Sequence, residues 1–153
     1  METKCAFRFV STEDNNAGIN ARSWREADGQ IGIAISPALM QQLRTKDELA
    51  FLVGHEMAHA VAGHHSAYGL RNLAGTFSIV RSGQPRMELE ADAIAALITE
   101  KAGYNALAGV SVLMRLNASQ TKPSESHPDL SDRIAVIMAT HEAIQQGHSL
   151  TLD

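Results

Sequence analysis

The chain has 153 residues, of which 44% are hydrophobic and 20% charged, with 13 basic and 17 acidic side chains. This length and composition predict a single globular domain over residues 1–153 and exclude a disordered or fibrous chain. The net charge of −4 argues against a nucleic-acid partner, which usually requires a basic surface. No uncharged apolar run approaches the roughly 18 residues that span a bilayer, so we expect no transmembrane segment in this sequence.

Two short strands are predicted near the N-terminus. Residues 5–10 alternate in the manner of a half-buried strand. In residues 31–35 (IGIAI) the three isoleucines share one face, and the glycine and alanine share the other. Because the second face carries only small residues, it would let another polypeptide backbone lie close against it.

The rest of the chain is predicted to be mainly helical. Ser36-Pro37 combines a capping side chain with proline at the first helical position, and this helix is expected to end near residue 44. Thr45 and Glu48 form a capping box at the start of a longer helix that reaches about residue 64. Further helices are predicted over residues 85–101, 105–117 and 129–146, with a loop or short helix over 68–84 and an ordered loop over 120–128.

The stretch His55-Glu56-Met57-Ala58-His59 carries the clearest functional signal. Four residues advance a helix by about one turn, so both imidazoles project from one face, at a spacing that one zinc ion can bridge. Glu56 can reach a metal-bound water without being a ligand. A solvated His–Glu face is the alternative, but this helix is otherwise apolar, and unpaired imidazoles are costly to bury among apolar side chains.

A second acidic stretch, Glu88-Leu89-Glu90-Ala91-Asp92, lies near the start of the helix over residues 85–101. Glu88 is the candidate for a third zinc ligand, with Glu90 as its rival. Asp92 lies one turn further on, where it can accept the other N–H of a ligand histidine. An acidic helix N-terminus favoured by the helix dipole is the alternative, but it does not explain an aspartate one turn inside an alanine-rich segment.

Two further residues are candidates for the substrate side of such a site. His127 precedes Pro128 in a rigid loop and could donate to a developing oxyanion or occupy an open metal position. A solvent-exposed loop histidine is the alternative for His127. Arg133 could pair with Asp92 or Asp129 or bind a substrate carbonyl, and a purely structural ion pair is equally compatible with the sequence.

Taken in order, these motifs resemble the HtpX-like and CAAX-endopeptidase-like zinc peptidases of metallopeptidase family forty-eight. The resemblance covers about residues 19–145, and several ordered motifs are more specific than one. They are Ile19-Asn20-Ala21, Asp47-Glu48-Leu49-Ala50 leading into Gly54-His55-Glu56-Met57-Ala58-His59, Glu88-Leu89-Glu90-Ala91-Asp92, and Ser126-His127-Pro128 with Arg133. The resemblance implies an α+β, mainly helical, zincin-like (gluzincin) domain, with a small N-terminal sheet and an active-site helix that carries the HExxH motif.

The resemblance also implies an activity and its residues. The expected activity is that of a zinc-dependent endopeptidase, in which a Glu-activated zinc-bound water hydrolyses peptide bonds of unfolded or misassembled proteins or peptides. The implied residues are His55, His59 and Glu88 as ligands of one Zn²⁺ per chain, Glu56 as general base, and His127 and Arg133 toward the substrate. Extended substrate is expected to bind as an added strand along Gly32, Ile33 and Ala34.

A latent or non-catalytic zinc-bound module that binds peptides like a chaperone is the alternative function. Its fourth zinc position would be blocked, for instance by His127. The presence of Glu56 favours catalysis, because a structural zinc site needs no base beside its first ligand. Residues 21–29 form a longer and more charged link than is usual in the family.

The nearest resemblance is to soluble bacterial members. No apolar stretch of the kind that a signal peptide needs follows the first residues. Because residues 5–10 already have the pattern of a strand, a leader could lie upstream of this sequence. We expect a soluble domain in the bacterial periplasm, or one attached to a membrane through such a leader, with the cytoplasm as the alternative.

Overall fold

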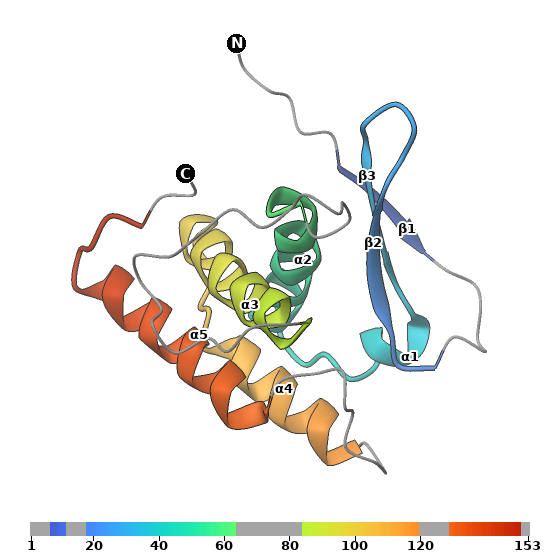
Figure 1. Ribbon diagram of the computed structural model, residues 1–153. Coiled ribbons are helices and arrows are strands. Elements are labelled where there is room, and N and C mark those ends of the chain that lie inside the picture. The colour runs from blue at the N-terminus through green and yellow to red at the C-terminus, as the bar shows by residue number, and fades with distance from the viewer. Residues whose placement is uncertain (1–6, 12–17, 64–83, 120–128, 151–153) are drawn as a thin grey trace.

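The computed structural model describes residues 7–11, 18–63, 84–119 and 129–150, which form a mainly helical arrangement with one small sheet (Figure 1). The elements are β1 (Phe7–Ser11), β2 (Ala21–Arg25), β3 (Ile31–Ile35), α1 (Pro37–Met40), α2 (Lys46–Val61), α3 (Gln84–Lys101), α4 (Ala108–Ser119) and α5 (Leu130–Gln145). The predicted class, mainly helical with a small N-terminal sheet, is confirmed. Within these ranges, none of the helices combines the length and the apolar character that a membrane crossing requires.

The sheet has the strand order β1-β3-β2, with β1 parallel and β2 antiparallel to the central β3. The isoleucines of β3 pack against α2, where Ile31 and Ile33 form an apolar cluster with Ala60. Both backbone edges of β3 are already paired. The prediction that Gly32, Ile33 and Ala34 bind an added strand is therefore wrong.

The small residue at the centre of β3 has a different explanation. A Cβ at Gly32 would overlap the indole ring of Trp24, which lies across it on β2. Residues 21–29, expected as a charged link, instead provide strand β2 and a turn. At Gly32, the second face of β3 is thus covered by a side chain of the same sheet.

The helix caps predicted from the sequence are confirmed. The Ser36 hydroxyl accepts from the Leu39 N–H, although α1 ends at Met40 and not near residue 44. Thr45 accepts from the Glu48 N–H at 3.1 Å. The Glu48 carboxylate turns back and accepts from the Arg44 N–H at 2.6 Å. These bonds fix where α2 begins, and hence which of its faces meets the neighbouring helices.

The central helix α2 lies between the sheet and the other helices, with α3 packed closely along it (Figure 1). Small side chains allow this approach, because Ala58 of α2 is fully buried against Ala91 of α3. A Cβ at Gly54 would lie only 3.3 Å from the backbone oxygen of Ala95. The short distance between the two helices brings the first turns of α3 against the histidines of α2.

Candidate metal centre

Two histidines of α2 form one side of a polar cluster. His55 and His59 are one helical turn apart, and their Nε2 atoms lie 3.1 Å from each other. The two rings stand nearly perpendicular, at 84°, with centroids 4.8 Å apart. His55 is only 8% exposed, so one of the two imidazoles is held almost entirely inside the protein. The expectation that both rings share one helix face is confirmed.

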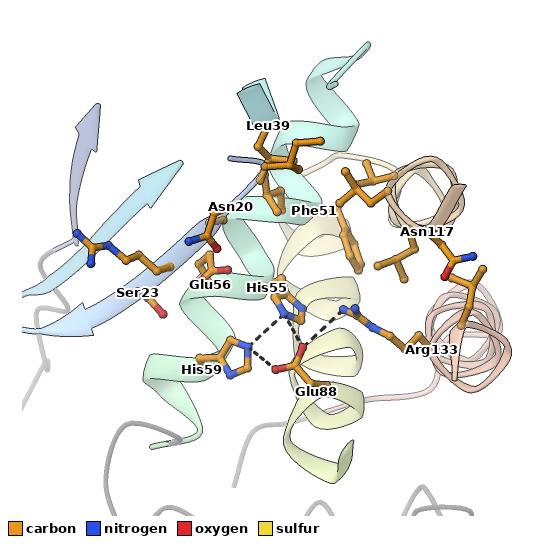
Figure 2. A pocket seen from close by; sticks show the side chains of 18 of the residues that line it. Asn20, Ser23, Leu39, Phe51, His55, Glu56, His59, Glu88, Asn117 and Arg133 are labelled. Atoms are coloured by element: carbon orange, nitrogen blue, oxygen red, sulfur yellow. Dashed lines mark hydrogen bonds and ion pairs between the residues drawn. The ribbon is translucent and has the colours of Figure 1, made fainter. Parts of the chain in front are cut away.

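The third member of the cluster is Glu88, from α3. Its Oε2 lies 3.4 Å from Nε2 of His55, and its Oε1 lies 3.4 Å from Nε2 of His59. Figure 2 shows the three side chains pointing toward one another from the two helices. Among the described residues, the group able to hold a metal ion consists of these three, and the rival ligand Glu90 does not belong to it.

The spacing of this triad (His55, His59 and Glu88) fits a zinc ion. Zinc binds histidine nitrogen and carboxylate oxygen at 2.0–2.2 Å, and ligand atoms on a tetrahedron with arms of 2.0–2.1 Å are separated by about 3.3–3.4 Å. The two Nε2 atoms lie 3.1 Å apart, and each lies 3.4 Å from a different oxygen of Glu88, Oε2 for His55 and Oε1 for His59. Two imidazoles and one carboxylate are also the donor set of catalytic zinc sites that leave a position for water or substrate.

Asp92 lies behind the triad and is fully buried. Its Oδ1 is 3.0 Å from Nδ1 of His55, a buried ring nitrogen that makes no well-aligned hydrogen bond within the described ranges. The contact is therefore a close ion pair. The negative charge of Asp92 favours a proton on Nδ1, which leaves Nε2 of His55 free to bind a metal.

Arg133 of α5 holds Asp92 from the other side. Its Nε donates to Oδ2 at 2.7 Å and its Nη2 donates to Oδ1 at 2.8 Å, a bidentate pair. Nη2 also lies 3.9 Å from Oε2 of Glu88. Of the pairings that the sequence left open for Arg133, the structure has the one with Asp92.

The charges around the triad favour a cation. Burial alone would lower the pKa of His55, but the neighbouring Asp92 and Glu88 carboxylates outweigh it and raise the pKa to about 9. Burial would likewise raise the pKa of Glu88, yet His55, His59 and Arg133 together lower it to about 2. The surroundings thus stabilise positive charge at this point, which is the electrostatic requirement of a metal site.

Glu56 is the remaining acidic side chain at the site. It lies beside His55 on α2 and is only 7% exposed. Burial raises its pKa, opposed by the charge of His55 and by a hydrogen bond from Ser23. Ser23 belongs to β2 and was not predicted as a site residue, because the sequence around it was interpreted as a link. Figure 2 shows Ser23 and Glu56 side by side, between the sheet and the triad.

A cleft of about 500 Å³ joins these groups. Residues 19–23 line it on the sheet side, and α4 and α5 line the opposite side. Apolar side chains cover the part beyond the triad, among them Leu39, Phe51, Leu52, Leu113, Leu116 and Leu130. Figure 2 shows Phe51 near His55, with Leu39 farther from the three candidate ligands. The cleft is wide enough for side chains of a polymeric ligand.

The structure therefore brings together most of the predicted site residues. His55, Glu56, His59, Glu88 and Arg133 all line the cleft, with Asp92 directly behind. Gly32, Ile33 and Ala34 do not line it. His127, and with it the loop predicted over residues 120–128, lies outside the described residues.

Comparison with known families gives one match. The model of peptidase family M48 matches residues 9–83. This range contains β2, β3, part of β1, and α2 with both histidines, and it ends just before α3, which carries Glu88. A comparison with curated proteins gives no match.

Proposed function

Because the chain belongs to peptidase family M48 and is therefore a metallopeptidase, we propose that it is a zinc-dependent endopeptidase of the gluzincin type, a zincin-like single domain over residues 1–153. The convergence of His55, His59 and Glu88 carries this proposal. Glu88 lies outside the matched range, so its position beside the histidines supports the site independently of the family match.

Each partner in the proposed chemistry has a distinct task. Zinc held by the triad would polarise the scissile carbonyl and lower the pKa of water to about 7. Glu56 takes a proton from the attacking water and later delivers it to the leaving amine. Burial raises its pKa, which favours its protonated form for the transfer to the leaving amine, and the hydrogen bond from Ser23 holds its carboxylate in place.

The substrate is proposed to bind along β2. Within the described residues β2 pairs only with β3, and residues 19–23 line the cleft beside Glu56. An extended polypeptide can add to such an edge through main-chain hydrogen bonds with little sequence preference. Unfolded or misassembled proteins and peptides offer an extended backbone together with exposed apolar side chains, and the apolar part of the cleft can accept such side chains.

His127 and the latent binding module are the two remaining parts of the proposal. For His127 we keep the prediction of a donor to the oxyanion or an occupant of the open metal position. The latent binding module has less support than the peptidase, because a structural site gives no role to the buried Glu56 carboxylate beside the first ligand.

The decisive experiment compares cleavage of unfolded casein by wild type and by Glu56→Gln, with bound zinc quantified in both. We expect one zinc per chain in each protein and a loss of casein cleavage of at least about 100-fold in Glu56→Gln, since a general base contributes 10²–10⁴-fold. Glu90→Gln is the matched control, because Glu90 lies outside the triad.

The possible results separate the functions. Equal cleavage by Glu56→Gln and wild type would show that Glu56 is not the base. Zinc binding without cleavage of casein would favour the latent module, for which His127→Ala is the next variant. Absence of zinc from wild type would refute the site itself.

A further inference from the structure

Two arginines are among the residues that line the cleft, and their side chains are bound very differently. Arg133 is committed to Asp92 through two hydrogen bonds. Arg22, on β2, is exposed, and within the described ranges its guanidinium has no ion-pair partner. Arg22 is thus a positive charge at the rim of the cleft that the surrounding residues leave available to a ligand.

The position of Arg22 is nevertheless restrained. Its guanidinium carbon lies 5.4 Å from the centroid of the Trp24 ring, within the range of a cation–π contact. Trp24 is itself fixed, because it covers Gly32 and donates through Nε1 to Glu26 at 2.8 Å. The same Glu26 oxygen accepts from Arg8 at 2.8 Å, so its charge is already balanced.

Arg22 lies next to Ser23 on β2, but its side chain does not point toward Glu56. Ser23 faces α2, since its hydroxyl hydrogen-bonds to Glu56. Because side chains alternate along a strand, Arg22 and Trp24 lie on the opposite face. A polypeptide paired with β2 would alternate in the same way. Its residue across from Arg22 would therefore meet the guanidinium, while the neighbouring residues turn toward the cleft.

We propose that Arg22 is a specificity-determining residue that selects an acidic side chain on the polypeptide substrate, at the substrate position across from Arg22 on β2. This inference rests on the proposed peptidase function and on binding along β2. Opposite charges directly across two strands at an exposed site favour pairing by an amount equivalent to about two- to five-fold in kcat/KM.

The test uses the zinc-loaded enzyme and one peptide scaffold in which Asp, Asn or Lys is placed at each position around the scissile bond in turn. For wild type we expect one position at which Asp is preferred over Asn about two- to five-fold in kcat/KM, and Lys is disfavoured. Arg22→Gln should abolish this preference, and Arg22→Glu should invert it toward Lys. Salt at about 0.5 M should weaken it in wild type, because the charge is exposed.

Arg25→Gln is the matched control. It removes the same charge from the same strand, but Arg25 does not line the cleft and bonds to the Gly29 and Ala60 carbonyls. An Asp preference that persists in Arg22→Gln, or that Arg25→Gln abolishes equally, would overturn the inference and leave the peptidase function intact. Failure of wild type to cleave any peptide would overturn the peptidase function, and this inference with it.

Discussion

Asp92 shows how one residue connects the packing of the protein to the metal site. A fully buried carboxylate is costly unless its charge is compensated. Here Arg133 donates two hydrogen bonds to it, and the His55 ring nitrogen lies 3.0 Å away. The Asp92 carboxylate is thus stabilised from both sides, and in turn it restrains the orientation of His55, a candidate metal ligand.

The first prediction concerns this carboxylate. Asp92→Asn keeps the side-chain volume but removes the charge facing Nδ1 of His55, so we expect zinc affinity to fall about 10- to 100-fold. A titration against a chromogenic zinc chelator measures the affinity directly. Glu90→Gln, on the same helix, should leave it unchanged. An unaltered affinity in Asp92→Asn would mean that Asp92 does not orient His55.

Spacing within one helix made several residues predictable. Helical geometry alone placed His55 and His59 on one face and put Glu56 beside them. The need for a third ligand made Glu88 a candidate beside Glu90, and the order of motifs, through the family resemblance, indicated Glu88 and the activity. Ser23 escaped prediction because its importance comes from a contact with Glu56 that bridges two elements. No local pattern in the sequence encodes such a contact.

At the scale of elements, an ion pair joins the start of α2 to α4. The Arg115 guanidinium donates to Glu48 Oε1 at 2.8 Å and to Oε2 at 3.0 Å, and it also bonds to the Gln42 carbonyl at 2.6 Å. Glu48 is only 3% exposed. Because α4 provides one wall of the cleft, this pair also holds that wall against the metal-binding helix.

The second prediction follows from the titration of Glu48. The hydrogen bonds from Arg115 lower its pKa below 4.5, against the opposing effect of burial. A carboxyl whose pKa is lowered by folding stabilises the protein fully above its unfolded pKa, and the stabilisation is lost as pH falls through the folded value. Glu48→Gln should therefore reduce the free energy of unfolding by about 2–3 kcal/mol at pH 7, and by progressively less below about pH 4.5.

Urea unfolding at pH 7, 5, 4 and 3 provides the measurement. Asp47→Asn is the control, because Asp47 is a half-buried acidic residue in the same first turn that takes no part in the Arg115 pair, and its substitution should cost less than about 1 kcal/mol. A difference between Glu48→Gln and wild type that stays constant down to pH 3 would contradict the role given to this ion pair.

Strand β2 was not predicted from the sequence. Its five residues, ARSWR, have no regular apolar alternation, and their exposure does not alternate either. This segment is a strand because it pairs with β3, and its local sequence alone does not favour a strand. The helices were easier to predict, because their caps lie within a few residues of the turns that they stabilise.

At the scale of the whole molecule, the triad connects two helices that the sequence separates by a long interval. His55 and His59 come from α2 and Glu88 from α3, so one bound ion would cross-link both. A ligand that binds only the folded state stabilises it by mass action. The fold and the metal are therefore expected to be coupled thermodynamically.

This coupling gives the third prediction. Free zinc at about 100 times its dissociation constant should stabilise the protein by about 2.7 kcal/mol, which corresponds to a rise in Tm of about 5–10 °C for a domain of this size. Differential scanning calorimetry with zinc and with excess chelator measures it. Glu88→Ala should lose the shift and Glu90→Ala should keep it. A shift of equal size in Glu88→Ala would exclude Glu88 as a ligand.

The approach of α2 to α3 has a consequence for how mutations in this protein should be interpreted. Gly54 precedes the first histidine and lies against the backbone of Ala95, where a Cβ would be 3.3 Å from the carbonyl oxygen. This contact works as a spacer that sets how far Glu88 stands from the histidines. We expect a larger residue at Gly54 to push α2 and α3 apart and so weaken metal binding at the proposed site, although His55, His59 and Glu88 are unchanged. A substitution at this glycine is thus expected to impair the proposed site without changing any of the residues that form it.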